Sequence, residues 1–108
     1  PYADTRFDRV FSVNTIYFWT DPVGMVREIL RVLKKDGLCC IALGSREFMQ
    51  DLPFTDERFR LYSREEAENL FSENGFEVLE TFSRWHKTTS AARMELLREE
   101  LFIRARPA

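Results

Sequence analysis

Two apolar runs on either side of one helix-like segment constrain the fold of this chain more than any other feature. The first run, Phe7–Val13, is rich in apolar, β-compatible residues and predicts a strand buried on both faces. The second run, Leu38–Leu43, is continuously apolar and is followed by Gly44, as expected of a parallel strand covered by helices. Strand, helix and strand in this order indicate an open α/β sheet.

The segment between the two runs carries the start and stop signals of a helix. Asp21 can cap the helix, and Pro22 stands at the first helical position, where a missing N–H costs nothing. One apolar stripe follows at helical spacing, formed by Val26, Ile29, Leu30 and Leu33. Lys34 and Lys35 favour the negative end of this helix, and Gly37 is expected to supply a left-handed stop.

The second half of the chain predicts one more helix and two strands. Ser63 and Glu66 have the spacing of a capping box, and we expect the helix to end at Gly75 with a contact between Phe71 and Phe76. A strand over 76–85 would place four side chains on one face, those of Val78, Glu80, Phe82 and Arg84. A short last strand follows at 101–105. We interpret 45–62 as a loop or short helix, and 88–97 as polar and then weakly helical.

Composition excludes several classes of function. The 108 residues fit one domain, and a net charge of −2 with a pI near 5.5 gives no electrostatic reason to expect nucleic acid or an anionic membrane as partner. No segment approaches the ~20 apolar residues that span a bilayer, and no secretory signal is visible. The adjacent Cys39 and Cys40 would point to opposite faces of a strand, which disfavours a disulfide and fits a reducing cytoplasm. Together with the single His86 they supply too few ligands for a metal site, so we predict none.

Candidate site residues follow the first strand. Asn14, Thr15 and Tyr17 stand where a parallel strand gives way to its helix, at the carboxyl end where open α/β sheets bind ligands. The alternative is that Asn14 makes a turn and Tyr17 packs. The neighbouring Phe18 and Trp19 are candidates for a pocket wall, with core packing as the alternative.

Two further groups invite a catalytic interpretation. His86, after the predicted strand end at Trp85, is a weak candidate for a general base, against the alternative of an exposed histidine beside Lys87. Glu65 and Glu66 look like paired carboxylates, but complementarity to the helix start explains both without catalysis.

The order of these motifs resembles the middle and end of class I S-adenosylmethionine-dependent methyltransferases of the type 11 kind. The resemblance rests on Phe7-Asp8-x-Val10-x-Ser12-x-Asn14, on Ile16-Tyr17-Phe18-Trp19-x-Asp21-Pro22, on the helix end around 28–37, and on stretches at 53–55, 62–66 and 74–76. It covers roughly two-thirds of the chain. The family usually has Pro and Gly at positions 35 and 36. The spacing of Asn14 and Tyr17 is similar to the N-P-P-Y signature of amino-group methyltransferases, although both prolines are missing.

The resemblance implies a fold, a cofactor and a set of contacts. The implied fold is a partial Rossmann-like α/β methyltransferase fold, a mixed sheet of about four strands with flanking helices, in which the last strand inserts antiparallel between the two before it. The implied function in the intact protein is methyl transfer from S-adenosylmethionine to a small-molecule acceptor. Cofactor contacts are expected at Ser12, Val13, Asn14 and Tyr17. Substrate contacts are expected at Phe18, Trp19, Phe48, Met49 and Phe54.

One expected motif of this family is missing. The chain contains no G-x-G, because Gly24, Gly37, Gly44 and Gly75 each stand alone. We therefore expect residues 1–108 to be the C-terminal half of a methyltransferase domain, lacking the N-terminal cofactor-binding half and inactive alone. The alternative is a non-catalytic α/β interaction or oligomerisation module. For a half-domain, the free edge of Phe7–Val13 predicts a homodimer, formed by pairing of the two edges or by exchange of this segment. The alternative is that residues 1–6, with help from 45–62, fold over the edge and leave a monomer.

Overall fold

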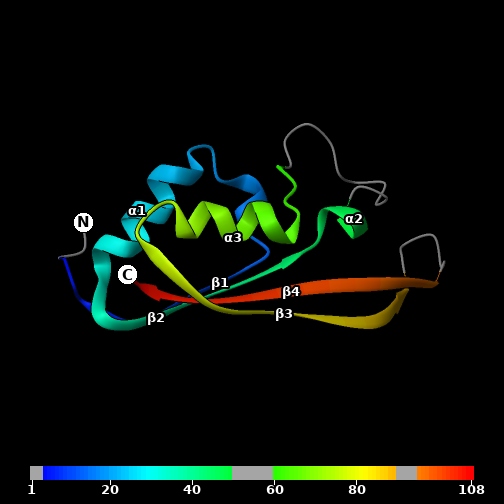
Figure 1. The fold of residues 1–108 in the computed structure, drawn as a ribbon. Helices are drawn as coiled ribbons and strands as arrows, with labels where there is room; N and C mark the ends of the chain where they lie inside the picture. The colour runs from blue at the N-terminus through cyan, green and yellow to red at the C-terminus, as the bar shows by residue number, and fades with distance from the viewer. Residues whose placement is uncertain (1–3, 50–59, 90–94) are drawn as a thin grey trace.

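The computed structural model describes residues 4–49, 60–89 and 95–108 of the chain, and within them one sheet carries helices on one face (Figure 1). In chain order the elements are β1 (Phe7–Val13), the 3-10 helix η1 (Ile16–Phe18), α1 (Pro22–Val32), β2 (Leu33–Gly44), α2 (Arg46–Met49), α3 (Arg64–Ser72), β3 (Phe76–Thr89) and β4 (Glu95–Pro107). The strand order is β1-β2-β4-β3. β1 and β2 are parallel, whereas β4 is antiparallel to both its neighbours. This confirms the mixed sheet and the inserted last strand.

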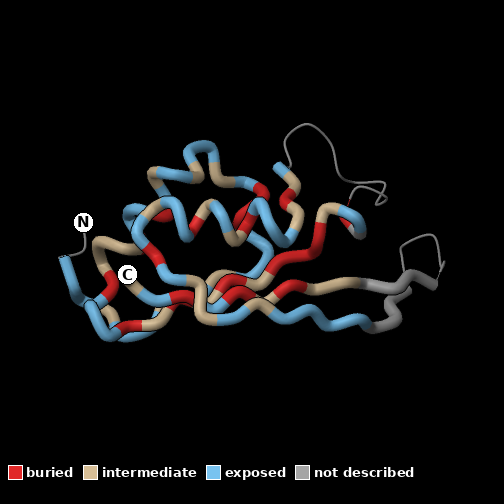
Figure 2. The backbone as a smooth tube through the Cα atoms, viewed as in Figure 1, coloured by how far each residue is buried: buried red, intermediate tan, exposed pale blue. Residues whose placement is uncertain are grey.

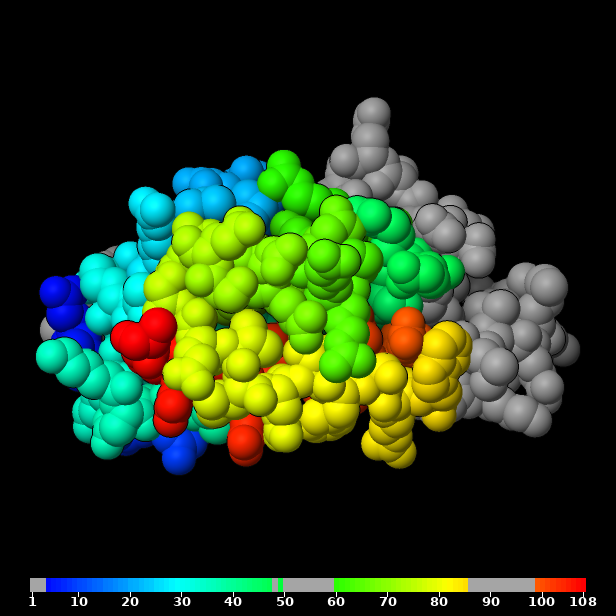
Figure 3. Space-filling view, viewed as in Figure 1, coloured from blue at the N-terminus to red at the C-terminus, as the bar shows by residue number. Residues whose placement is uncertain are grey.

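The core lies between the sheet and the two longer helices. Figure 2 shows buried residues along the strands and within α1 and α3, and these two helices contact each other and lie over the sheet (Figures 1 and 3). The strand side chains of this core alternate along β2 and β4 and comprise Cys39, Ile41, Leu43, Leu101, Ile103 and Ala105. Within the described residues, no helix combines the length and the hydropathy needed to cross a membrane.

β1 has the predicted bounds, but its predicted burial on both faces is wrong. β1 pairs only with β2 and forms one edge of the described sheet. Val10 packs against the core, whereas Phe11 is 78% exposed and Val13 is 55% exposed. The reason is that α1 and α3 cover one face of the sheet, so alternate residues of β1 point to the other face, where the described part of the chain places no helix.

The junction between α1 and β2 also differs from the expectation. The helix begins as predicted, with the Asp21 carboxylate accepting a hydrogen bond from Gly24 N–H at 3.0 Å. It ends at Val32, and the chain enters β2 directly at Leu33. Gly37 is therefore not a left-handed helix stop but a residue within β2. A Cβ atom there would lie 2.7 Å from Leu33 Cδ1, so this glycine permits a close approach.

A register shift explains why the close approach is needed. Phe7 pairs with Leu33 while Arg9 pairs with Leu38, so β2 contains extra residues opposite Asp8. Leu33 is buried in the core at 2% exposure, and its side chain fills the space beside Gly37. The helix ends where the core takes up Leu33, rather than at the glycine.

The start and end of α3 follow the sequence closely. Ser63 Oγ accepts a hydrogen bond from Glu66 N–H at 3.2 Å, and the Glu66 carboxylate accepts one from Ser63 N–H at 3.1 Å, which confirms the capping box. Gly75 has a φ of +95°, and the rings of Phe71 and Phe76 meet edge to face with centroids 5.5 Å apart. The predicted turn and its hydrophobic contact are therefore confirmed.

β3 and β4 form a longer hairpin than the sequence indicated. Residues 88, 89 and 95–97 belong to strands, so the weakly helical interpretation of this region is wrong. Cross-strand contacts support the pairing, including the stacked rings of Phe82 and Phe102, with centroids 5.4 Å apart. The register shifts between Val78 and Glu80. Because of this shift Val78 packs on the core while Phe82 is 51% exposed, so the predicted common face is wrong.

Candidate functional site

The carboxyl end of β1 is marked by a residue in an unusual backbone conformation. Asn14 has a φ of +58°, in the left-handed region, while its N–H still donates to the Ala42 carbonyl at 2.9 Å and so completes the pairing with β2. Asparagine tolerates this conformation better than most residues. The change in direction releases the chain from the sheet and leads it into η1.

A chain of hydrogen bonds joins this strand end to the end of β2. The Gly44 N–H donates to the Tyr17 hydroxyl at 2.5 Å, and the Tyr17 hydroxyl donates to Asn14 Oδ1 at 3.2 Å. Tyr17 is only 3% exposed, whereas Asn14 lies at the surface. The structure therefore brings together Asn14 and Tyr17, which the sequence predicted, with the Gly44 amide, which it did not. A glycine closing an apolar strand was the available signal for Gly44.

Other groups hold the same loop in place. The Ser12 and Thr15 hydroxyls are hydrogen-bonded to each other. The Arg60 N–H donates to the Tyr17 carbonyl at 2.9 Å, which ties η1 to the segment before α3. Ser45, directly after β2, is a buried polar residue at 1% exposure. The loop is thus held by β1, by the end of β2 and by the segment before α3. Such support favours a preformed site.

The five predicted substrate contacts lie in different environments. Phe18 is 55% exposed and meets Tyr17 edge to face, with ring centroids 6.1 Å apart. Trp19 is partly buried against the core, and Met49 is buried in it at 5% exposure. Phe54 and the side chain of Phe48 lie outside what the structure describes. Phe18 is thus the aromatic residue of this set that the structure presents at the surface beside Tyr17.

The other predicted candidates lie away from this loop in the sequence. His86 does not follow a strand that ends at Trp85, because β3 continues and pairs His86 with Arg98. The hydrogen bond from the Ser63 backbone, and then the one from Arg46, hold the pKa of the Glu66 carboxyl below its usual value. The role of Glu66 in the capping box therefore explains this carboxylate without catalysis, as the sequence indicated.

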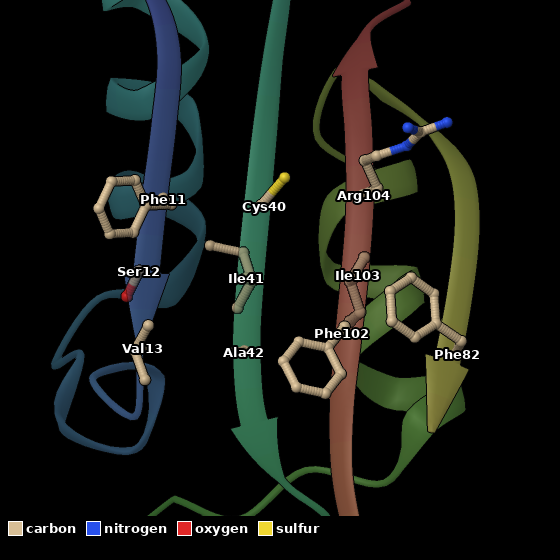
Figure 4. A pocket seen from close by; sticks show the side chains of 10 residues that line it. All are labelled: Phe11, Ser12, Val13, Cys40, Ile41, Ala42, Phe82, Phe102, Ile103 and Arg104. Carbon is tan, nitrogen blue, oxygen red and sulfur yellow. The ribbon is translucent and has the colours of Figure 1, made fainter. Parts of the chain in front are cut away.

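The sheet face opposite α1 and α3 carries an apolar cavity of about 250 Å³ (Figure 4). Side chains from all four strands line it, among them Phe11, Val13, Cys40, Ala42, Phe82 and Phe102. Cys39 and Cys40 lie on opposite faces as predicted, since Cys40 borders this cavity and Cys39 is in the core. Burial raises the pKa of the Cys39 thiol to about 12, so Cys39 is not a nucleophile at neutral pH.

Comparison with known proteins gives a consistent answer. Residues 1–41 match the sequence model of a family described as methyltransferase domain. Over 41 residues, 38% of this chain, the sequence is 44% identical to the chloroplastic 2-methyl-6-phytyl-1,4-hydroquinone methyltransferase 1 of Oryza sativa subsp. japonica, and the match covers 12% of that protein.

Among solved structures, the chain is similar to a protein of Thermotoga maritima described as a SAM-dependent methyltransferase and possible histamine N-methyltransferase. The TM-score is 0.73 with 25% identity, covering 100% of this chain and 59% of that chain. A SAM-dependent methyltransferase of Methanosarcina mazei shares the fold, with a TM-score of 0.66 and 14% identity over 95% of this chain and 61% of that one. These findings confirm the resemblance drawn from the sequence and the predicted fold class.

Proposed function

Because the chain has the fold and the resemblance of class I S-adenosylmethionine-dependent methyltransferases, we propose that residues 1–108 supply one half of a methyl-transfer site. The other half belongs to a longer protein, which transfers the methyl group to a small-molecule acceptor. The observation that carries this proposal is the hydrogen-bonded chain of Asn14, Tyr17 and Gly44 at the carboxyl ends of two parallel strands. Open α/β sheets bind their ligands at this place.

The described residues fit only part of such a cofactor. The backbone at the end of β1 offers hydrogen-bonding groups for one end of it, while the Asn14 amide and the Phe18 ring lie at the surface, where they can contact the acceptor. The sequence has no G-x-G for the remainder of the cofactor, and the chain spans 59% of the Thermotoga protein and 12% of the rice protein. We therefore infer that residues 1–108 alone bind the cofactor weakly or not at all.

The chain's own contribution to catalysis is positioning. Bound S-adenosylmethionine supplies an electrophilic methyl group. Tyr17 and Gly44 hold Asn14 at a fixed place, and Phe18 excludes water from one side of the acceptor. Methyl transfer needs donor and nucleophile in line at close range, and holding them there accounts for much of the rate enhancement.

Calorimetric titration of residues 1–108 with S-adenosylmethionine tests the first part of the proposal. We expect no measurable heat at micromolar cofactor, and binding in that range would overturn the division into two halves. In the longer protein, Asn14→Leu should lower kcat, with Val23→Ala as a matched control at an exposed position on α1. Equal loss of kcat in both variants would argue against a site at the strand end.

We further propose that residues 1–108 form a homodimer through the free edge of β1. The Arg6 N–H donates to the Val32 carbonyl and the Thr5 N–H to the Arg31 carbonyl, both at the end of α1. These hydrogen bonds join residues 5 and 6 to α1 and not to the free edge of β1. Exposed Phe11 lies beside this edge, and an unpaired apolar edge strand favours pairing with another strand.

The oligomeric state tests this proposal and its rival, a non-catalytic interaction module that uses the apolar sheet face. Light scattering over a dilution series should show a dimer that Phe11→Lys dissociates. Phe82→Lys places the same charge on the same face but at the opposite edge strand, and should leave the dimer intact. A monomer at every concentration would refute the dimer. Dissociation by both variants would move the interface to the cavity, because Phe11 and Phe82 both line it.

A further inference from the structure

The hydrogen bonds around Tyr17 fix which way the Asn14 amide is turned. We propose that Tyr17 is a positioning residue that turns the amide N–H groups of Asn14 toward the ligand, so that the site recognises a hydrogen-bond-accepting oxygen and not an amine or ammonium group. This inference rests on the proposed function and narrows its substrate class to ligands that present a carboxylate, carbonyl or phenolic oxygen.

The first step of the argument is the direction of each hydrogen bond. The Gly44 backbone N–H can only donate, so the Tyr17 hydroxyl oxygen accepts from it at 2.5 Å. The hydroxyl hydrogen is then donated to Asn14 Oδ1, 3.2 Å away. An amide oxygen held in this way leaves Nδ2 on the opposite branch of the planar group. In the structure the Tyr17 hydroxyl thus faces Oδ1 of the Asn14 amide and not Nδ2.

The second step concerns the surroundings of Nδ2. Asn14 is exposed, and over residues 4–49, 60–89 and 95–108 no group accepts a hydrogen bond from its Nδ2 atom. Two N–H donors are therefore presented at the carboxyl end of β1. A ligand oxygen can accept hydrogen bonds from these donors, whereas an ammonium group carries only donors and cannot.

The third step separates the two residues. Tyr17 is 3% exposed, and its carbonyl is held by the Arg60 N–H at 2.9 Å, so its hydroxyl acts through Asn14 without touching a ligand. The left-handed φ of +58° at Asn14 sets the place from which the side chain leaves the strand. Backbone conformation fixes the position of the amide, and Tyr17 fixes its rotation.

A pair of small aromatic probes tests the inference directly on the 108-residue chain. Benzoate offers only hydrogen-bond acceptors at its polar end, and benzylammonium offers only donors. In the ¹⁵N-labelled protein, benzoate should shift the Asn14 side-chain NH₂ resonances and bind about tenfold more tightly than benzylammonium, the factor expected of one hydrogen bond to a charged group. Non-specific attraction to a chain of net charge −2 would give the opposite order.

Three variants complete the experiment. Asn14→Asp replaces the donors with acceptors and should reverse the preference. Tyr17→Phe should abolish most of the preference while the remaining backbone resonances keep their dispersion. Tyr62→Phe alters another buried tyrosine whose hydroxyl takes no part in this hydrogen-bonded chain, and should leave the preference unchanged.

Three results would overturn the inference: a preference for benzylammonium in the unaltered chain, binding of neither probe, or a full benzoate preference in Tyr17→Phe. None of them bears on the cofactor titration, which measures a different ligand. The donor role of Asn14 can therefore fail while the methyl-transfer proposal stands, and the reverse also holds.

Discussion

Replacing Asn14 with Ala and with Gly separates two contributions that this residue makes to the strand end. Its side chain accepts the Tyr17 hydrogen bond, and its backbone adopts a φ of +58°. Both replacements remove the hydrogen bond, but only Gly adopts the left-handed conformation without strain. The comparison of the two variants therefore isolates the backbone contribution.

The expected magnitudes follow from these two contributions. Loss of the hydrogen bond from Tyr17 costs about 1 kcal/mol in either variant. An Ala in the left-handed region adds about 1–2 kcal/mol of strain. Gly avoids this strain but loses about 0.4–1 kcal/mol through the greater freedom of its unfolded chain. We therefore expect Asn14→Ala to be the less stable variant by about 0.5–1 kcal/mol, although Ala is ordinarily the better residue.

Urea denaturation followed by circular dichroism measures the free energies of unfolding of both variants. The melting temperatures of the two variants should differ by about 2–8 °C in the same order, because 1 kcal/mol shifts the Tm of a domain near this size by about 4–8 °C. Asn14→Asp keeps an acceptor for Tyr17 and serves as the matched control, with stability near that of the unaltered chain. An Ala variant as stable as the Gly variant would show that position 14 is not left-handed in solution. In that event the backbone conformation would no longer account for the position of the Asn14 amide.

Three other predictions concern stability. Gly75→Ala should destabilise by about 1–3 kcal/mol in urea titrations, because the φ of +95° disfavours any side chain and a Cβ atom would overlap the Leu30 side chain. Ser63→Ala should cost about 1 kcal/mol in the same titration by removing the cap at Glu66, and Ser63→Asp should restore most of it. Burial raises the Cys39 pKa from 9.0 to about 12, so its neutral thiol contributes stability that is full below pH 9 and falls as pH rises toward 12. Denaturation midpoints between pH 7 and 10.5 should fall less steeply in Cys39→Ala than in the unaltered chain.

Features set by short-range hydrogen bonds were predictable from the sequence. The Asp21 cap, the Ser63 capping box and the left-handed Gly75 each depend on residues within a few positions of one another. Gly37 shows the limit of such reasoning. Its neighbourhood has the composition of a helix stop, but the burial of Leu33 decides where the helix ends. That burial depends on contacts distant in the sequence.

The full length of the hairpin of β3 and β4 was not predicted from the sequence, for a related reason. Its distal part is polar, and its strands find their stabilisation in cross-strand pairs such as Phe82 with Phe102. Neither strand alone carries that information. The insertion of β4 between β2 and β3 came from the family resemblance, because periodicity says nothing about strand order.

The candidate site was predictable in part. The position of Asn14 after an apolar strand indicated a ligand-facing strand end, and the structure confirms that this strand ends beside β2. The sequence could not show that Tyr17 is buried and bonded to the Gly44 amide, because that contact joins residues 27 positions apart. The same hydroxyl donates to Asn14 Oδ1, so the sequence could not show the direction of the Asn14 amide either.

The free edge of β1 can serve the proposed dimer or a complete strand-end site, but not both. Asn14 stands at the carboxyl end of this edge strand, and within the described sheet only β2 lies beside it. A two-fold pairing of two β1 edges is antiparallel, so it carries the two copies of Asn14 toward opposite ends of the joint strand pair. A parallel neighbour would instead bring its own carboxyl end next to Asn14 and enclose a ligand there. We therefore expect a longer protein that binds S-adenosylmethionine to lack this dimer. Cofactor binding should survive Phe11→Lys in that protein while the same change dissociates the dimer of residues 1–108. A longer protein that bound cofactor and also dimerised through β1 would contradict this argument.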